Sequence, residues 1–355
     1  MKIIIFFFLL VIVVSCGKDN QLEKFAKKFD QKISLKSILL NHNNDLLGDP
    51  TDIKIIDTTL LFLDPDGQYH MKAVNINNPD QFSRFLIKGR GPDEFGSIRS
   101  INVNNKNEVC FLDDNTLTYF EIPFISTDKP VSPSYQKKMS IDFGRIIFST
   151  ELNHVNISTG VFKDKGRFLI GHGSGEDKKR LIGQYPVDNL PESSNFIKGM
   201  AYQTFLRSGK DNNLVIAYCL NAGCITFLNF VNNGYRIKKE FMFYVPEYTP
   251  DTDQGLSVKF NPESLVCFID VCVVNNYVFA LFSGKSYEDY KTDAFLGNRI
   301  FVFTKEGDPK AEISLDRDIR CLDIDIKSST IYGVTLTPYP KIVKFPLKGT
   351  INLKI

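Results

Sequence analysis

Short apolar runs separated by turn residues follow one another along most of the chain. After residue 40 the runs are rich in β-branched and aromatic residues and end at Gly, Asn, Asp or Pro, and patterns of an amphipathic helix are almost missing. The first four runs cover residues 53–56, 60–63, 69–76 and 82–88, and the turn Asp64-Pro65-Asp66-Gly67 separates the second from the third. These signals predict an all-β protein.

The runs fall into six groups with a repeat of roughly 45 to 65 residues, and four strands per unit at this spacing are typical of propeller blades. The first strands of the groups are expected to begin near Ile53, Ile98, Asn156, Tyr202, Phe268 and Cys321. We therefore predict a single-domain six-bladed β-propeller with four-stranded antiparallel blades over residues 32–355. The fourth strand of the last blade is either residues 351–355 or a strand lent by residues 32–38.

The first residues have the pattern of an export signal that ends in a cysteine. A basic start is followed by an apolar run at residues 3–14, which is too short to span a bilayer but has the composition of a secretory signal peptide. Val13-Val14-Ser15-Cys16 resembles the bacterial lipobox. Residues 1–15 are therefore predicted to be a lipoprotein signal peptide, Cys16 to be lipidated and residues 16–31 to be a tether. The alternative is an ordinary secreted protein in which Cys16 is incidental.

Several stretches together carry a resemblance to a known family. They are the lipobox, the Gly- and Pro-containing corner at residues 88–95, Ala201-Tyr202-Gln203, residues 280–284, and residues 300–303 followed by Gly307-Asp308-Pro309. With these motifs the chain resembles the TolB-like six-bladed β-propeller lipoproteins of Gram-negative bacteria over nearly its whole mature length. The Gly-Pro-Gly-Glu-Phe of the family is here Gly91-Pro92-Asp93-Glu94-Phe95, which keeps the turn. The resemblance implies a propeller in the cell envelope, an outer membrane lipoprotein on the periplasmic face or the cell surface, with no settled activity.

Charge and cysteine content narrow the function classes. The chain has 43 basic and 41 acidic residues and no long charge run, which argues against nucleic acid as a partner.

Cys219 and Cys224 flank a predicted hairpin turn, so they either form a disulfide or remain free thiols. Cys267 and Cys272 have the same spacing within one predicted strand, where an odd separation points them to opposite faces. Positions inside strands argue against zinc, and buried free thiols are the simpler interpretation.

Propeller ligands usually meet the mouth of the central channel. When the six predicted first strands are aligned by their apolar pattern, comparable positions near their beginnings are occupied by Asp52, Arg99, Asn156, Tyr202, Asp270 and Arg320. Such a ring is suited to a small polar ligand, an anion or the carboxylate of a peptide. The alternative is that these residues pair with one another and fix the contacts between blades, because buried charges need partners.

Calcium and a long loop complete the candidate chemistry. Asp52, Asn156 and Asp270 offer oxygen ligands for calcium, whereas the two arginines of the predicted ring would repel a cation. Tyr287 and Tyr290 lie in a long loop that is either a recognition surface or a cover. We expect a lipid-anchored envelope module that binds a protein or a small polar ligand. The alternative is a calcium-dependent, lactonase-like hydrolase with its site at the channel mouth.

Overall fold

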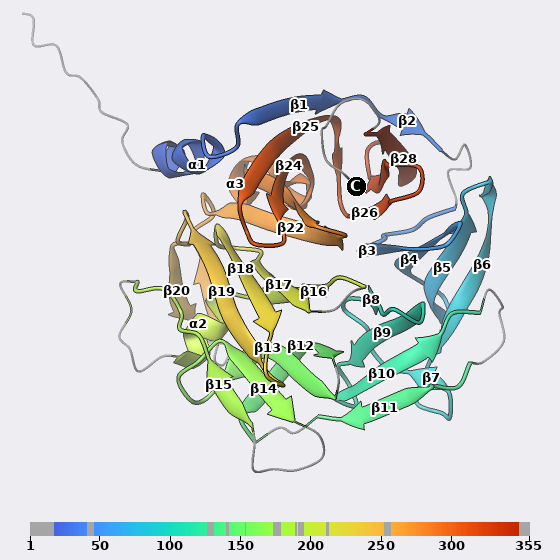
Figure 1. The fold of residues 1–355 in the computed structure, drawn as a ribbon, viewed down its shortest axis with the longest axis horizontal. Helices are drawn as coiled ribbons and strands as arrows, with labels where there is room; N and C mark the ends of the chain where they lie inside the picture. Colours follow the sequence, from blue (N-terminus) through green and yellow to red (C-terminus); the bar gives the residue numbers. More distant parts are fainter. Residues whose placement is uncertain are drawn as a thin grey trace, which may run out of the picture.

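A computed structural model describes residues 18–40, 46–125, 131–139, 142–152, 154–172, 179–188, 190, 195–210, 213–251 and 257–347. Six antiparallel sheets stand radially around a common centre (Figure 1). The predicted all-β, six-bladed β-propeller is confirmed. The predicted signal peptide at residues 1–15 and the predicted lipidation site Cys16 lie outside the described residues.

Each blade runs outward from an innermost strand. Blade 1 contains β3 (Asp52–Ile56), β4 (Thr59–Asp66), β5 (Tyr69–Asn75), β6 (Asn78–Lys88) and the short parallel strand β7 (Glu94–Phe95). Blade 2 contains β8 (Asn102–Val103), β9 (Glu108–Asp113), β10 (Thr118–Pro123) and β11 (Tyr135–Lys138). Blade 3 contains β12 (Gly144–Leu152), β13 (Val155–Phe162), β14 (Phe168–His172) and β15 (Arg180–Ile182).

The remaining blades follow the same plan. Blade 4 contains β16 (Thr204–Ser208), β17 (Leu214–Cys219), β18 (Cys224–Phe230) and β19 (Tyr235–Met242). Blade 5 contains β22 (Leu265–Val274), β23 (Tyr277–Ser286), β24 (Gly297–Thr304) and β25 (Pro309–Ile319). Blade 6 contains β26 (Leu322–Asp325), β27 (Thr330–Thr335) and β28 (Lys341–Pro346).

The N-terminal segment supplies the outer strands of the last two blades (Figure 1). β1 (Gln31–Leu35) lies parallel to β25 as a fifth strand of blade 5, and β2 (Ile38–Leu39) pairs antiparallel with β28 as the fourth strand of blade 6. The N-terminus therefore lends the fourth strand, as one of the two predictions has it, but through β2 alone. Residues 351–355, the other candidate, lie outside the described residues.

The described part of the expected tether is packed against the propeller. α1 (Lys18–Ala26) is followed by a turn to Phe29, and the side chains of Phe25 and Phe29 are buried. The Phe25 ring stacks on Phe243 at 4.1 Å between centroids, and the Phe29 ring lies 4.9 Å from that of Phe301. These two side chains fill the seam between blades 4 and 5, so Phe25 and Phe29 belong to the folded core.

The third blade differs from its prediction by one strand. β12 is its innermost strand, and the stretch expected to begin that blade is β13, the second strand. Residues 144–152 carry their own β-branched and aromatic run, which the grouping into fours passed over. Asn156 therefore does not lie on an innermost strand.

Three segments are inserted between successive strands of the blades. α2 (Asn195–Ala201) and the hairpin of β20 (Tyr248–Asp251) with β21 (Ser257–Phe260) contact each other beside blade 4. α3 (Tyr287–Tyr290) and the 3-10 helix η2 (Lys291–Phe295) connect β23 to β24. Among the described residues, no helix is both long and apolar enough to cross a membrane.

The corner at residues 88–95 joins blade 1 to blade 2, as predicted. The Glu94 carboxylate accepts a hydrogen bond from the Gly91 N–H at 2.8 Å, and the Gly89 N–H bonds the carbonyl of Phe95 at 3.1 Å. A Cβ on Gly89 would lie 1.8 Å from Glu94 Oε2, so a side chain there would displace the Glu94 carboxylate from this position. His70 Nε2 also contacts the Phe95 carbonyl at 2.8 Å, which fixes the corner to blade 1.

Candidate functional site

Asp52 and Asp270, two of the six predicted ring residues, come together at the centre of the propeller through Arg207. Arg207 Nη2 lies 2.8 Å from Asp52 Oδ2 and 2.9 Å from Asp270 Oδ1. The side chains of all three residues are at most 5% exposed. These contacts join blades 1, 4 and 5, and sequence reasoning had not singled out Arg207.

Every nitrogen of the Arg207 guanidinium contacts an acceptor. Its Nε–H donates to Asp270 Oδ1 at 3.1 Å, and Nη1 donates to Ser100 Oγ at 2.5 Å and to the Ile101 carbonyl at 3.2 Å. Nη2 adds a hydrogen bond to Asp270 Oδ1 at 2.9 Å and the ion-pair contact with Asp52, so each of the three nitrogens has an acceptor. A buried charge is tolerated only with such partners, so Arg207 is a structural centre rather than a free binding group.

A repeated carboxylate contact links blades 5, 6, 1 and 2 in turn. In each case one aspartate on an innermost strand accepts the N–H of the next residue and also an N–H from the following blade. Asp270 bonds Val271 and Leu322, Asp323 bonds Ile324 and Ile55, and Asp52 bonds Ile53 and Ile101, with inter-blade distances of 2.9, 2.7 and 3.0 Å. For Asp52 and Asp270, this geometry matches the interpretation that they fix blade contacts.

Burial and the neighbouring cations shift the pKa values of Asp52 and Asp270 in opposite directions. Burial by itself would raise the pKa of Asp52, but Arg207 and Lys54 outweigh it and hold that pKa below its usual value. Burial raises the pKa of Asp270 despite the same two cations. Of the two central carboxyl groups, that of Asp52 therefore has the stronger tendency to be ionised.

The other four predicted ring residues lie elsewhere, so the expected ring is not formed. Arg99 binds Asp114 at 2.6 Å near the surface, and Asn156 contacts Lys137 and Ser158 from a second strand. Tyr202 follows α2, and its hydroxyl lies 3.4 Å from Asp188. Arg320 lies between β25 and β26, where its backbone N–H bonds Val334. Aligning strands by apolar pattern cannot detect such displacements, because the strands differ in where they begin.

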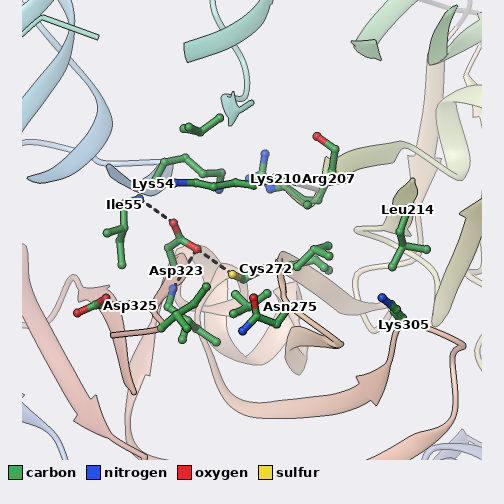
Figure 2. A pocket seen from close by; sticks show the side chains of 18 of the residues that line it. Lys54, Ile55, Arg207, Lys210, Leu214, Cys272, Asn275, Lys305, Asp323 and Asp325 are labelled. Carbon is green, nitrogen blue, oxygen red and sulfur yellow. Dashed lines mark hydrogen bonds between the residues drawn. The ribbon is translucent and has the colours of Figure 1, made fainter. Parts of the chain in front are cut away.

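A cavity of about 350 Å³ opens where the innermost strands end. Its floor is formed by Lys54, Arg207 and Asp323, and Figure 2 shows these side chains facing one space. The walls are mostly apolar, with Ile55, Val103, Leu214, Val271, Val274 and Ile324, and they also carry Ser208, Asn213 and Asn275. The rim is charged, with Lys210, Lys305, Lys327, Asp57 and Asp325. The prediction had placed the ligand site where these strands begin, so the cavity lies at the other end of the channel.

Lys54 is the floor residue with hydrogen-bonding capacity left. Its Nζ donates to Asp52 Oδ1 at 3.0 Å and to the Ile53 carbonyl at 2.8 Å, and an ammonium group carries three N–H bonds. Burial and Arg207 would lower the pKa of Lys54, but the surrounding aspartates outweigh them and raise it, so the group stays charged. Among the residues that the structure describes, two acceptors thus contact this buried ammonium group, and one N–H remains for a ligand at the floor.

Cys272 at the cavity wall is an unreactive thiol. Its Sγ lies 2.8 Å from Asp323 Oδ1, as the dashed line in Figure 2 shows. Burial and the neighbouring Asp323 carboxylate raise the pKa of Cys272 well above its usual value, so the sulfur keeps its proton. A nucleophilic role for this cysteine is therefore disfavoured.

The residues named for calcium do not fit that ion. The carboxylates of Asp52 and Asp270 are bound by Arg207, whose positive charge would repel a cation, and Asn156 lies away from them on β13. No group of three His, Cys, Asp or Glu residues in the described ranges is placed to hold a metal ion.

Tyr287 and Tyr290 lie on α3 at the edge of blade 5, and each is 50% exposed. Ser286 caps this short helix by accepting the Asp289 N–H. The Lys285 ammonium lies 5.4 Å from the Tyr290 ring centroid and pairs with Asp318 at 2.5 Å. The loop is therefore an ordered surface that presents two aromatic rings to solvent.

Comparison with known proteins agrees with the architecture. The family model described as TolB-like 6-blade propeller-like matches residues 27–327. The crystal structure of a protein from Bacteroides fragilis, whose description is that of an exported protein, is 14% identical, with 89% of this chain and 99% of that chain covered and a TM-score of 0.52. A virginiamycin B lyase from Staphylococcus aureus, solved with quinupristin, is 15% identical over 88% of this chain and 89% of that chain, with a TM-score of 0.44. No curated protein matches the sequence.

Proposed function

The chain belongs to the TolB-like six-bladed propeller family, and from that premise we propose that it is a lipid-anchored binding module of the bacterial cell envelope. The ligand is a small organic molecule held in the cavity at the end of the channel. One observation carries this proposal: the cavity has apolar walls and a buried, charged floor in which Lys54 retains one N–H donor. Ligand sites are commonly concave and apolar, with a few convergent polar groups.

The lining indicates the chemistry of the ligand. The Lys54 N–H requires an acceptor such as a carbonyl, hydroxyl or carboxylate oxygen. Lys210, Lys305 and Lys327 at the rim outnumber Asp57 and Asp325, which favours a ligand with a negative end. The apolar walls suit a hydrocarbon body of limited size. A small carboxylate with an apolar body meets all three conditions.

A variant that obstructs the cavity tests this function. Ile326 lines the cavity and is 41% exposed, so Ile326→Trp adds bulk at the mouth without disturbing the core. The matched control is Val231→Trp, since Val231 is 43% exposed in a turn of blade 4 away from the cavity. Native mass spectrometry of the protein after incubation with envelope extract should show one added small molecule for the wild type and the control, and none for Ile326→Trp. Absence of any added mass on the wild type would refute ligand binding.

Membrane attachment rests on Cys16 and has a separate test. Cys16→Ser should move the protein from the membrane fraction to the soluble fraction and abolish incorporation of labelled fatty acid. Retention in the membrane without acyl label would contradict the lipid anchor. An anchor of this kind requires export through the predicted signal at residues 1–15, and it places the protein in the envelope, where the outer membrane is the expected site.

A protein partner at α3 is the second candidate interaction. Exposed tyrosines with few rotatable bonds are favoured at protein interfaces, and Tyr287 and Tyr290 are half exposed on one short helix. The double variant Tyr287→Ala and Tyr290→Ala should lose a crosslinked partner in envelope extracts. Tyr339→Ala, at a 57% exposed tyrosine of blade 6, should keep it. Equal crosslinking by all three proteins would argue against a docking surface at α3.

A further inference from the structure

Two cysteines and an arginine form a buried cluster between blades 3 and 4. Cys219 ends β17 and Cys224 begins β18, and the register that pairs Tyr218 with Ile225 places the two cysteines opposite each other. Arg167 Nη2 lies 3.8 Å from Cys219 Sγ and 3.3 Å from Cys224 Sγ. Because one nitrogen contacts both sulfurs, the two side chains point to the same side of the hairpin.

The surroundings of this pair are polar although fully buried. Thr204 Oγ1 lies 3.3 Å from Cys219 Sγ, and Arg167 Nη1 binds Glu240 Oε2 at 2.6 Å. The hydrogen bond from Cys224, together with Arg167, lowers the pKa of Cys219 against the effect of burial, while the same bond and burial raise the pKa of Cys224. The pKa values of the two neighbouring thiols are thus shifted in opposite directions, and the Arg167 guanidinium beside both sulfurs favours a thiolate at this pair.

The other described cysteines lack such a partner. Cys267 and Cys272 have the same sequence spacing, but both lie on β22 and belong to different apolar clusters, so they cannot bond to each other. Burial raises the pKa of Cys110 to about 12, and burial raises that of Cys321 well above its usual value. Cys219 and Cys224 are therefore chemically distinct within the described part of the chain.

We propose that Cys219 and Cys224 are a redox site that closes to an intramolecular disulfide as the exported chain folds. The site is independent of the cavity, but its oxidation in the cell depends on the export that the proposed function includes. The Cys219 thiolate attacks one sulfur of a disulfide oxidant, giving a mixed disulfide, and the deprotonated Cys224 then displaces the reduced oxidant. The two thiols lose two protons and two electrons, and the disulfide of the oxidant is reduced to two thiol groups, which are two molecules of glutathione when oxidised glutathione is the oxidant.

The position of the pair explains when it would close and what closure does. Both thiols are completely buried in a cluster with Ala201, Tyr202 and Ala222, which α2 and the β20–β21 hairpin cover. An oxidant can reach them only before these insertions are in place. Once closed, the disulfide ties β17 to β18 at the point where the insertions rest, so the oxidised protein should hold them more firmly.

Counting thiols in refolded protein tests the site without relying on export. The full mature chain is unfolded, reduced, refolded with oxidised glutathione, quenched with N-ethylmaleimide under denaturing conditions and weighed. The wild type and the Cys267→Ser/Cys272→Ser control should each carry two fewer labels than their fully reduced forms, and a peptide joining Cys219 to Cys224 should appear. Cys219→Ser and Cys224→Ser should each abolish that loss.

Full labelling of the refolded wild type, or a disulfide between any other pair, would overturn the proposal. Export is decided separately by the fractionation of Cys16→Ser, so failure of the anchor and failure of the disulfide are distinguishable. If refolded protein closes the pair while protein quenched directly from cells does not, the redox site stands and the oxidising compartment is wrong.

Discussion

Arg207 at the centre of the propeller and Arg167 between blades 3 and 4 are both almost fully buried, with side chains 5% and 1% exposed. Arg207 faces two carboxylates that are at most 2% exposed. Arg167 faces one carboxylate, that of Glu240, whose side chain is 33% exposed, and two thiols. Its Nε has no hydrogen-bond partner among the described residues.

The difference lies in what each cation leaves behind when it is removed. The side chains of Asp52 and Asp270 are at most 2% exposed, so their charges depend on Arg207 and Lys54. Glu240 can reach water, and thiols need no counter-charge when protonated. Equal burial of two arginines therefore does not mean equal importance, because the accessibility of the partners decides the cost.

The largest expected effect is that of Arg207→Met. It leaves two buried carboxylates with one remaining cation, so the free energy of unfolding should fall by about 3–5 kcal/mol, measured by urea denaturation. Arg317→Met, at an exposed arginine of blade 5, should change it by less than about 0.5 kcal/mol. Adding Asp52→Asn to Arg207→Met should restore part of the loss. A strictly additive double variant would show that the pair is not coupled.

Arg167→Met should cost less, about 1–2 kcal/mol by the same measurement, because the Glu240 carboxylate is accessible to water and a Cys219 thiolate that loses the cation can take up a proton. If Arg167→Met proved as destabilising as Arg207→Met, partner accessibility would not be the deciding factor.

Asp323→Asn tests the repeated carboxylate contact while both buried arginines stay in place. The amide keeps one acceptor oxygen but cannot serve both the Ile324 N–H and the Ile55 N–H, so the seam between blades 6 and 1 should lose about 1 kcal/mol. Asp57→Asn, at an exposed rim position, is the control and should leave urea denaturation unchanged. Similar urea midpoints for both variants would show that the contact at Asp323 contributes nothing to the free energy of unfolding.

The smallest expected effect is a pH dependence of the free energy of unfolding. It comes from His70, which lies outside both arginine regions. Burial lowers the pKa of His70 in the folded protein, so the unfolded chain binds more protons. Stability is then present above the usual histidine pKa of about 6.5 and is lost as pH falls below it. His70→Gln, which keeps a donor for the Phe95 carbonyl, should flatten thermal stability between pH 7.5 and 5.5. An unchanged slope would assign that dependence to other groups.

The fold was readable from the sequence because strand signals recur along the chain, and each blade needs only local pairings between consecutive strands. Residues 144–152 have a clear strand pattern, but the predicted repeat left them between two blades, so the innermost strand of blade 3 was missed. The docking of Phe25 and Phe29 was missed for another reason. Their partners, among them Phe243 and Phe301, lie more than 200 residues away, and no local pattern reports that distance.

The centre of the molecule was predictable only in part. Asp52 and Asp270 stood out as acids in strands with an innermost position, and the structure joins them. Arg207 did not, because its partners Ser100 and Asp270 are 107 and 63 residues away and meet only when the ring closes. The cavity lies at the other end of these strands from the predicted ligand residues, since the sequence pattern alone does not tell at which end the side chains leave space.

The docking of α1 fixes how an anchored propeller would stand on a bilayer. α1 lies at the outer rim of the disc, beside β1, rather than over either flat face (Figure 1). Cys16 precedes the start of α1 at Lys18 by two residues, a reach of about 7 Å, so a lipid on Cys16 would hold the rim near blades 4 and 5 against the membrane. The disc would then stand on its edge, and both ends of its central axis, including the cavity, would open parallel to the membrane surface.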